Sequence, residues 1–189
     1  MLDVALQFLA DELNAYLFAR ANSNSVVVKL GKVVDEAGKY AFAEETLCAS
    51  IINIEEERTF KSQLPQYTYV NGQHLVSEPD LKCNLSVLIA ANFKLYDQAL
   101  KFISYTLTFF QSHPVFTSQE SPALDPRIGK LTVELQSPTY EQLNQIWAFI
   151  GAKQLPSVLY KVRMVVLQDE VPASIQPPLS AISTDLHSQ

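Results

Sequence analysis

The chain has 189 residues, of which 48% are hydrophobic and 18% charged, and its formal net charge is −6. This length suits one domain with a sizeable buried core. The acidic balance argues against a nucleic-acid-binding protein, which needs a basic face. No apolar run reaches the roughly 18–20 residues of a membrane span, which argues against a membrane protein.

A helix is predicted over residues 2–21. Its apolar residues recur at helical spacing from Leu2 to Leu17, and its acids lie near the start, where the helix dipole favours negative charge. Since no basic region precedes an apolar stretch, this terminus lacks the pattern of a signal peptide. We therefore expect the protein to be made in the cytoplasm.

Two strands are predicted next, over residues 26–30 and 46–58, with a loop or irregular hairpin over 31–45 between them. The second strand ends in three consecutive acids, so we expect it to extend beyond the covered part of the sheet. Of these acids, Glu55 and Glu57 share a strand face because alternate residues point the same way. Both are candidate interface residues, and a solvated strand end is the simpler interpretation.

A hairpin is predicted over residues 67–76, with Asn71 and Gly72 as its turn. The Asn-Gly pair favours a two-residue hairpin because both turn positions need positive φ. The strands are short and partly polar, so we expect the hairpin to project from the body. Asn71 and Gly72 are therefore included among the candidate interface residues.

Residues 81–116 are predicted to form the centre of the fold. The segment 81–91 is apolar on both alternate faces, which is typical of a central strand covered on both sides. In the helix that follows, over 95–111, polar residues form only a narrow stripe. The remaining residues, including Tyr96, Leu100 and Phe110, are expected to be buried in the core or against another chain.

An ordered loop is predicted over residues 112–129, followed by a half-buried strand over 130–136 with clean alternation. The third helix is expected to begin at Ser137, as the cap, with Pro138 at the first helical position. Gly151 is expected to end it.

The last predicted strand covers residues 157–168 and carries Lys161 and Arg163 two positions apart, among the apolar residues Leu159, Val165 and Leu167. Such a pair suits either two surface charges or a subunit interface. Residues 171–189 then contain three prolines, no glycine and one acid, which predicts a flexible, proline-rich C-terminal tail.

The predicted fold is a single α/β (α+β) domain over residues 1–170, with a mixed, mostly antiparallel sheet flanked by three helices. The glycines form no phosphate-binding loop, and the three histidines lie far apart in the sequence. Cys48 and Cys83 are interpreted as buried structural thiols. We therefore predict no enzyme activity, no cofactor and no metal site.

Three long stretches, taken together, resemble a known family. They are LDVALQFLADELNAYL near the start, LSVLIAANFKLYDQALKFISYTLTFFQSHPVFT in the centre, and SPALDPRIGKLTVELQSPTYEQLNQIWAFIGAKQLPSVLYKVRMVVL late in the chain. In this order they are similar to the tail-terminator, or cap, proteins of extracellular contractile injection systems of the antifeeding-prophage type. The likeness covers residues 2–168 and contains no catalytic signature.

The resemblance implies a structural role. Such proteins form a ring, expected to be a homo-hexamer, on the last layer of inner tube and sheath at the end far from the baseplate. The ring ends polymerisation and couples the tube protein to the sheath protein. The resemblance also implies assembly in the bacterial cytoplasm and a place in an extracellular or cell-associated particle. Neither nucleic acid nor a membrane is expected as a partner.

Two alternatives remain at this point. One is another structural part of such a particle, a baseplate adaptor or head–tail connector. The other is a small ligand-binding or hydrolase domain with a site under the loop 31–45, which would need polar groups that converge on a pocket.

Overall fold

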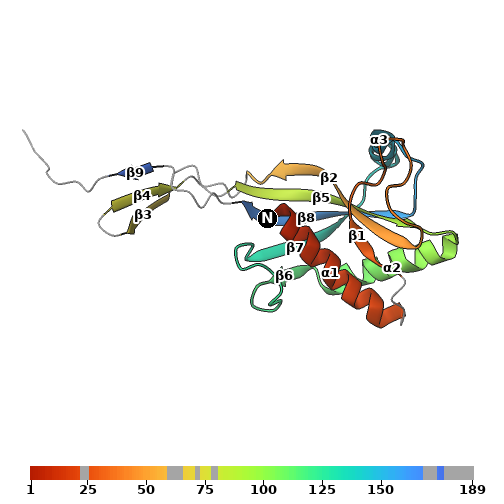
Figure 1. Ribbon diagram of the computed structural model, residues 1–189, viewed down its shortest axis with the longest axis horizontal. Coiled ribbons are helices and arrows are strands. Elements are labelled where there is room, and N and C mark those ends of the chain that lie inside the picture. The colour runs from red at the N-terminus through yellow and green to blue at the C-terminus, as the bar shows by residue number, and fades with distance from the viewer. Residues whose placement is uncertain (22–25, 59–65, 71–72, 78–80, 168–173, 177–189) are drawn as a thin grey trace, which may run out of the picture.

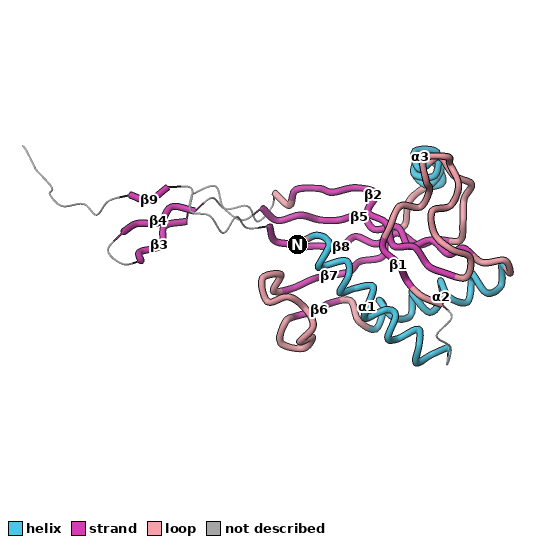
Figure 2. Tube along the Cα trace, viewed as in Figure 1, coloured by secondary structure: helices cyan, strands magenta, loops and turns pink. Residues whose placement is uncertain are grey.

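The structure is a computed structural model that describes residues 1–21, 26–58, 66–70, 73–77, 81–167 and 174–176, with only the backbone path given for the described parts of 66–77 and 164–176. Within these ranges the chain forms three helices, a six-stranded sheet and a three-stranded sheet (Figures 1 and 2).

The six-stranded sheet is mixed, as predicted. Only its first two strands are parallel to each other, and all other neighbours are antiparallel. In spatial order it contains β1 (Val28–Leu30), β2 (Thr46–Glu56), β5 (Leu81–Asn92), β8 (Ser157–Leu167), β7 (Lys130–Gln136) and β6 (Val115–Thr117). The short strand β6 lies inside the segment predicted to be a loop. Three residues paired with the start of β7 are too few to give a strand pattern in the sequence.

Strand β5 is central, and the prediction that both its faces are covered is confirmed. Leu85, Val87 and Ile89 point into the larger core cluster. Leu88 and Ala90 belong to a second cluster on the opposite face. A strand buried on both sides needs apolar residues at successive positions, which is why its sequence shows no alternation.

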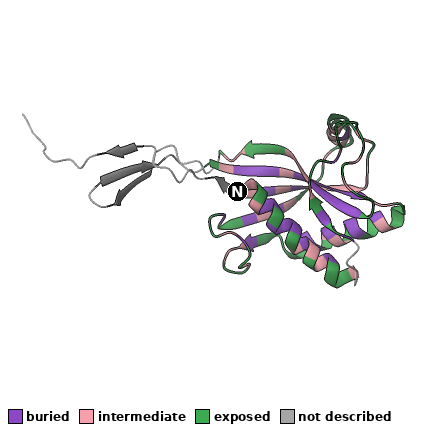
Figure 3. Cartoon of the chain, in the orientation of Figure 1, coloured by how far each residue is buried: buried purple, intermediate pink, exposed green. Residues whose placement is uncertain are grey.

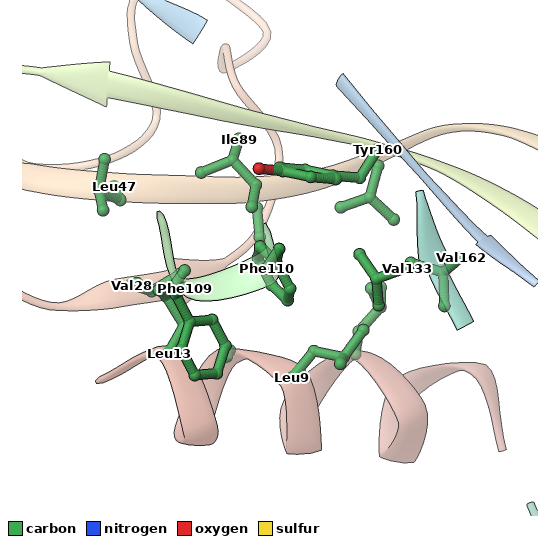
Figure 4. Packing of buried hydrophobic residues seen from close by; sticks show 14 of the residues in the cluster. Leu9, Leu13, Val28, Leu47, Ile89, Phe109, Phe110, Val133, Tyr160 and Val162 are labelled. Carbon is green, nitrogen blue, oxygen red and sulfur yellow. The ribbon is translucent and has the colours of Figure 1, made fainter. Parts of the chain in front are cut away.

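Helices α1 (Leu2–Ala21) and α2 (Tyr96–Ser112) cover one face of this sheet (Figure 1). Phe110 joins α2 to the sheet, 4.8 Å from Tyr160 of β8, and Tyr16 of α1 joins the two helices, 5.2 Å from Phe109, both measured between ring centroids. Figure 4 shows Leu9 and Leu13 pointing from α1 toward the side chains of α2 and the sheet.

Helix α2 separates the predicted apolar residues into two groups (Figure 3). Phe102 and Phe110 are buried among the sheet side chains, as expected. Tyr96 and Leu100 are 68% and 44% exposed, so this chain alone does not cover them. Their burial against another chain stays a prediction.

The opposite face is covered by helix α3 (Tyr140–Ile150) and by residues 31–45. Trp147 packs with Val33 and Leu88 in the second cluster, and the Tyr40 hydroxyl donates to the Lys153 carbonyl oxygen at 3.0 Å. Residues 31–45 form a loop with one isolated bridge between Val34 and Tyr40, in agreement with the prediction.

The predicted start of α3 was wrong by two residues. Thr139, not Ser137, is the N-cap: its hydroxyl accepts from the Gln142 backbone N–H, while the Gln142 side chain accepts from the Thr139 N–H. This reciprocal pair satisfies two helix donors, which a cap at Ser137 would not. Gly151 ends the helix with φ of +77°, as predicted.

A three-stranded sheet, called the arm below, consists of β3 (Gln66–Val70), β4 (Gln73–Ser77) and β9 (Ser174–Gln176). The antiparallel pairing of β3 with β4 confirms the hairpin, although its predicted turn, Asn71-Gly72, lies outside the described residues. In Figure 1 the arm lies beyond the ends of β2 and β5, away from the helices.

Strand β9 lies within the predicted tail, where it pairs with β4. Most of residues 171–189 falls outside the described residues, so the flexibility of the tail stays a prediction.

Candidate interaction surface

Four charged residues lie on the face of the sheet that α3 covers, next to this helix: Glu55, Glu134, Lys161 and Arg163. Lys161 and Arg163 follow Leu159 at alternate positions of β8, and Glu134 alternates with Gln136 in β7. Leu159 and Gln136 line a hollow beside α3, so strand alternation places the charged residues on that face. We call Glu55, Lys161, Glu134 and Arg163 the charged belt.

Two ion pairs join the members of this belt. Lys161 Nζ lies 2.7 Å from Glu55 Oε2, across the intervening strand β5. Lys161 can cross β5 because the residue opposite it there is the small Ser86. Arg163 Nε lies 2.9 Å from Glu134 Oε2, on the neighbouring strand β7.

The structure thus brings together three of the predicted interface residues: Lys161, Arg163 and Glu55. Glu57 accepts a hydrogen bond from Asn84 Nδ2 at 2.8 Å. Asn71 and Gly72 lie outside the described residues. Whether any of these residues forms an interface stays a prediction.

The expectation that Lys161 and Arg163 share an apolar strand face needs correction. Their face carries Glu55 and Glu134, which pair with them. A register shift between β5 and β8 also separates the pairs Leu85–Val162 and Cys83–Val165, so the simple alternation does not continue to Val165. Neither cross-strand partners nor a bulge can be read from the sequence of one strand.

A groove lies beside the belt, between α3 and the sheet, with a volume of about 440 Å³. We call it the α3 groove. Its lining is uncharged and mixes apolar side chains with amides: Ile52, Asn53, Ser86, Gln136, Ser137, Pro138, Gln142, Gln145, Ile146, Phe149 and Leu159. At its rim Phe149 is 84% exposed. The sequence offered one signal for this residue, an aromatic outside the apolar stripe of the helix.

Two observations concern metal binding and the cysteine thiols of the described residues. Within those residues, no group of three or more His, Cys, Asp or Glu side chains is placed to hold a metal ion. Cys48 is buried, and burial raises the pKa of its thiol to about 11, so the thiol stays protonated at neutral pH. Burial also raises the pKa of Cys83, with a smaller contribution from Glu56.

No helix in the described part of the chain is both long enough and apolar enough to cross a membrane.

The sequence matches the family model of the Pvc16 N-terminal domain over residues 5–181. No curated protein matches the chain.

Two solved structures share its fold. The PVC sheath/tube terminator of an extracellular contractile injection system, in the extended state, has a TM-score of 0.67 and 16% identity, covering 100% of this chain and 64% of that one. The tube-terminating cap of the anti-feeding prophage has a TM-score of 0.61 and 15% identity, covering 98% and 61%. The chain therefore spans less than two thirds of the length of either protein.

Proposed function

Because the chain belongs to the Pvc16 N-terminal domain family, we propose that it is a structural cap of a contractile injection particle. In this role it forms a ring, of six copies, on the last layer of inner tube and sheath. The ring ends polymerisation and couples the two polymers, so that sheath contraction drives out the tube. The observation that carries the proposal is the family match over 5–181, together with the terminator fold of both similar structures.

A cap is needed for a physical reason. A tube or a sheath is built of identical layers, and each finished layer presents the same adhesive surface to the next, so a heterologous contact of this kind does not stop by itself. A terminator must match the last layer on one side and offer no equivalent surface on the other. Contact surfaces alone meet this requirement.

The surface of the described residues supports such a role. Tyr96 and Leu100 of α2 remain exposed, and the charged belt and the α3 groove lie on the opposite face of the sheet. A protein with uncovered apolar and charged surface on two faces suits contact with more than one neighbour.

Deleting the gene in a strain that makes such particles tests the proposal. We expect particles with overlong or ragged distal ends, or sheaths that contract separately from their tubes, in electron micrographs. Normal particles, normally capped, would refute the proposal.

The position of the protein gives a second readout. A label on this chain should lie at the tip far from the baseplate. A label next to the baseplate would instead favour an adaptor within the same kind of particle, and would contradict the cap.

A further inference from the structure

The α3 groove is suited to an uncharged segment of polypeptide. None of its lining residues is charged. Lys161 and Glu55, on strands that also line the groove, are 2.7 Å apart and offset each other's charge. Amides such as Asn53 and Gln145 can donate to and accept from main-chain groups or hydroxyls, and the apolar remainder takes aliphatic side chains.

An occupant would gain stability by covering Phe149, which is 84% exposed at the rim. Complete burial of such a side chain is worth about 1.5–3 kcal/mol. Ile146 is only half-buried beside it, so the apolar area available for contact is continuous along this side of α3.

The chain itself contains a segment of matching chemistry. Thirteen residues follow β9, from 177 to 189. Leu179, Ile182 and Leu186 recur there at steps of three and four, the spacing of one helix face. Asp185 is the single residue of this segment whose side chain is charged at neutral pH, taking histidine as neutral, and four of the remaining nine positions are serine or threonine.

We propose that the apolar stripe of residues 179–186 docks in the α3 groove of a second copy of this chain. In this binding mode an amphipathic segment places its apolar side chains against the apolar part of the groove. Its hydroxyl-bearing face then lies toward the groove amides or the solvent.

A second copy is favoured over the same chain because of where the segment starts. It follows β9, which pairs with β4 in the arm, and Figure 1 shows β9 and α3 at opposite ends of the long axis. The contact is heterologous, so every copy in a ring can both give and receive a segment. This inference rests on the proposed ring.

Disulfide cross-linking of full-length chains tests the contact. One chain carries Gln145→Cys at the groove, and another carries Ser183→Cys beside the apolar stripe. The matched control replaces the first chain by Asn144→Cys, since Asn144 is also exposed but lines the hollow on the other side of α3. The native thiols Cys48 and Cys83 are buried and do not compete.

Mild oxidation should give a disulfide-linked dimer with Gln145→Cys in at least about tenfold higher yield than with Asn144→Cys, the ratio that 1.4 kcal/mol of preference produces. Adding Phe149→Ala to the groove chain should lower the yield to the control level. Adding Tyr140→Ala, which removes an even more exposed aromatic outside the groove, should leave it unchanged.

Equal yields from the two cysteine positions would overturn the proposal. So would an intrachain disulfide in monomers that carry both Gln145→Cys and Ser183→Cys. If Leu179→Asp with Leu186→Asp leaves both assembly and capping intact, the docking fails while the proposed cap stands. If the deletion strain caps its particles normally, the cap fails whatever the cross-linking shows.

Discussion

At the scale of single residues, Asn14 joins helix α1 to the outer strand of the sheet. Its amide Nδ2 donates to the Val28 carbonyl oxygen at 3.1 Å, and its Oδ1 accepts from the Val28 N–H at 2.6 Å. Strand β1 pairs with β2 on its other side, so Asn14 satisfies backbone groups that face away from that partner. One side chain therefore fixes both the strand and the position of the helix.

We predict that Asn14→Leu lowers the free energy of unfolding by about 1–3 kcal/mol, because it leaves a donor and an acceptor of Val28 unsatisfied in a part-buried position. Denaturant unfolding measures the change. Gln7→Leu is the matched control, since Gln7 is exposed on the same helix and its side chain donates to the exposed Asp11. Equal effects of the two substitutions would contradict this role of Asn14.

A second residue-scale prediction concerns the start of α3. Thr139→Ala should destabilise the protein by about 0.5–2 kcal/mol, because both bonds of the capping box depend on that hydroxyl or on the turn it holds. Ser137→Ala should change stability little, since Ser137 does not cap. Thermal unfolding of both variants checks this, and a larger loss for Ser137→Ala would restore the cap expected from the sequence.

At the scale of elements, the charged belt holds β2, β8 and β7 together on one face across the sheet. Lys161→Glu should cost only about 0.5–1 kcal/mol in the isolated chain, because both partners are partly solvated. Adding Glu55→Lys restores an opposite-charge pair and should recover this stability. Denaturant unfolding of the single and double variants measures both steps.

Charge reversal of both pairs distinguishes an internal pair from a subunit contact. If the belt is buried between subunits, Lys161→Glu with Arg163→Glu weakens the ring, and adding Glu55→Lys with Glu134→Lys restores folding stability without restoring association. Association that returns together with stability would mean that the belt acts only within one chain.

The order of the elements and the burial of the core were largely predictable from the sequence. The side-chain pairs between strands and the helix cap were not. The continuous apolar run of β5 and the narrow polar stripe of α2 identified the core because burial on both faces requires apolar residues throughout. The sequence could not show that Glu55 meets Lys161, since that pairing depends on the register of three strands. Nor could it choose between Ser137 and Thr139, because both begin a plausible helix cap and only the reciprocal bonds decide.

The exposed residues of α2 show a further limit of periodicity. Tyr96 and Leu100 follow the same helical spacing as the buried Ile103, yet this chain leaves both exposed. Spacing shows that a side chain is suited to burial, but it does not show whether the same chain supplies the covering residues.

At the scale of the whole molecule, the tail should be separable from the core. Strand β9 pairs with β4 in the arm, which is a different sheet from the one under the helices. Deleting residues 171–189 should therefore leave the melting temperature of the isolated domain nearly unchanged while it weakens association. A fall of several degrees in the isolated domain would contradict this.

Salt should strengthen assembly. Six copies carry a formal charge of about −36, six times −6, and their mutual repulsion is screened as ionic strength rises. Light scattering across salt and protein concentration should show the mass increasing with both. A strict monomer throughout, even with tube or sheath protein present, would count against a ring-forming cap.

The connection between the arm and the body has a mechanical consequence. In chain order β2 leads to β3, β4 leads to β5, and β8 leads to β9, so the three adjacent strands β2, β5 and β8 all point toward the arm at one end. A pull on the arm draws these three strands in the same direction, so the ladders loaded in shear are those that join them to their outer neighbours, β1–β2 and β8–β7. Ladder hydrogen bonds lie across that direction and must yield together rather than one after another. The three central strands therefore move as one unit under tension that enters through the arm.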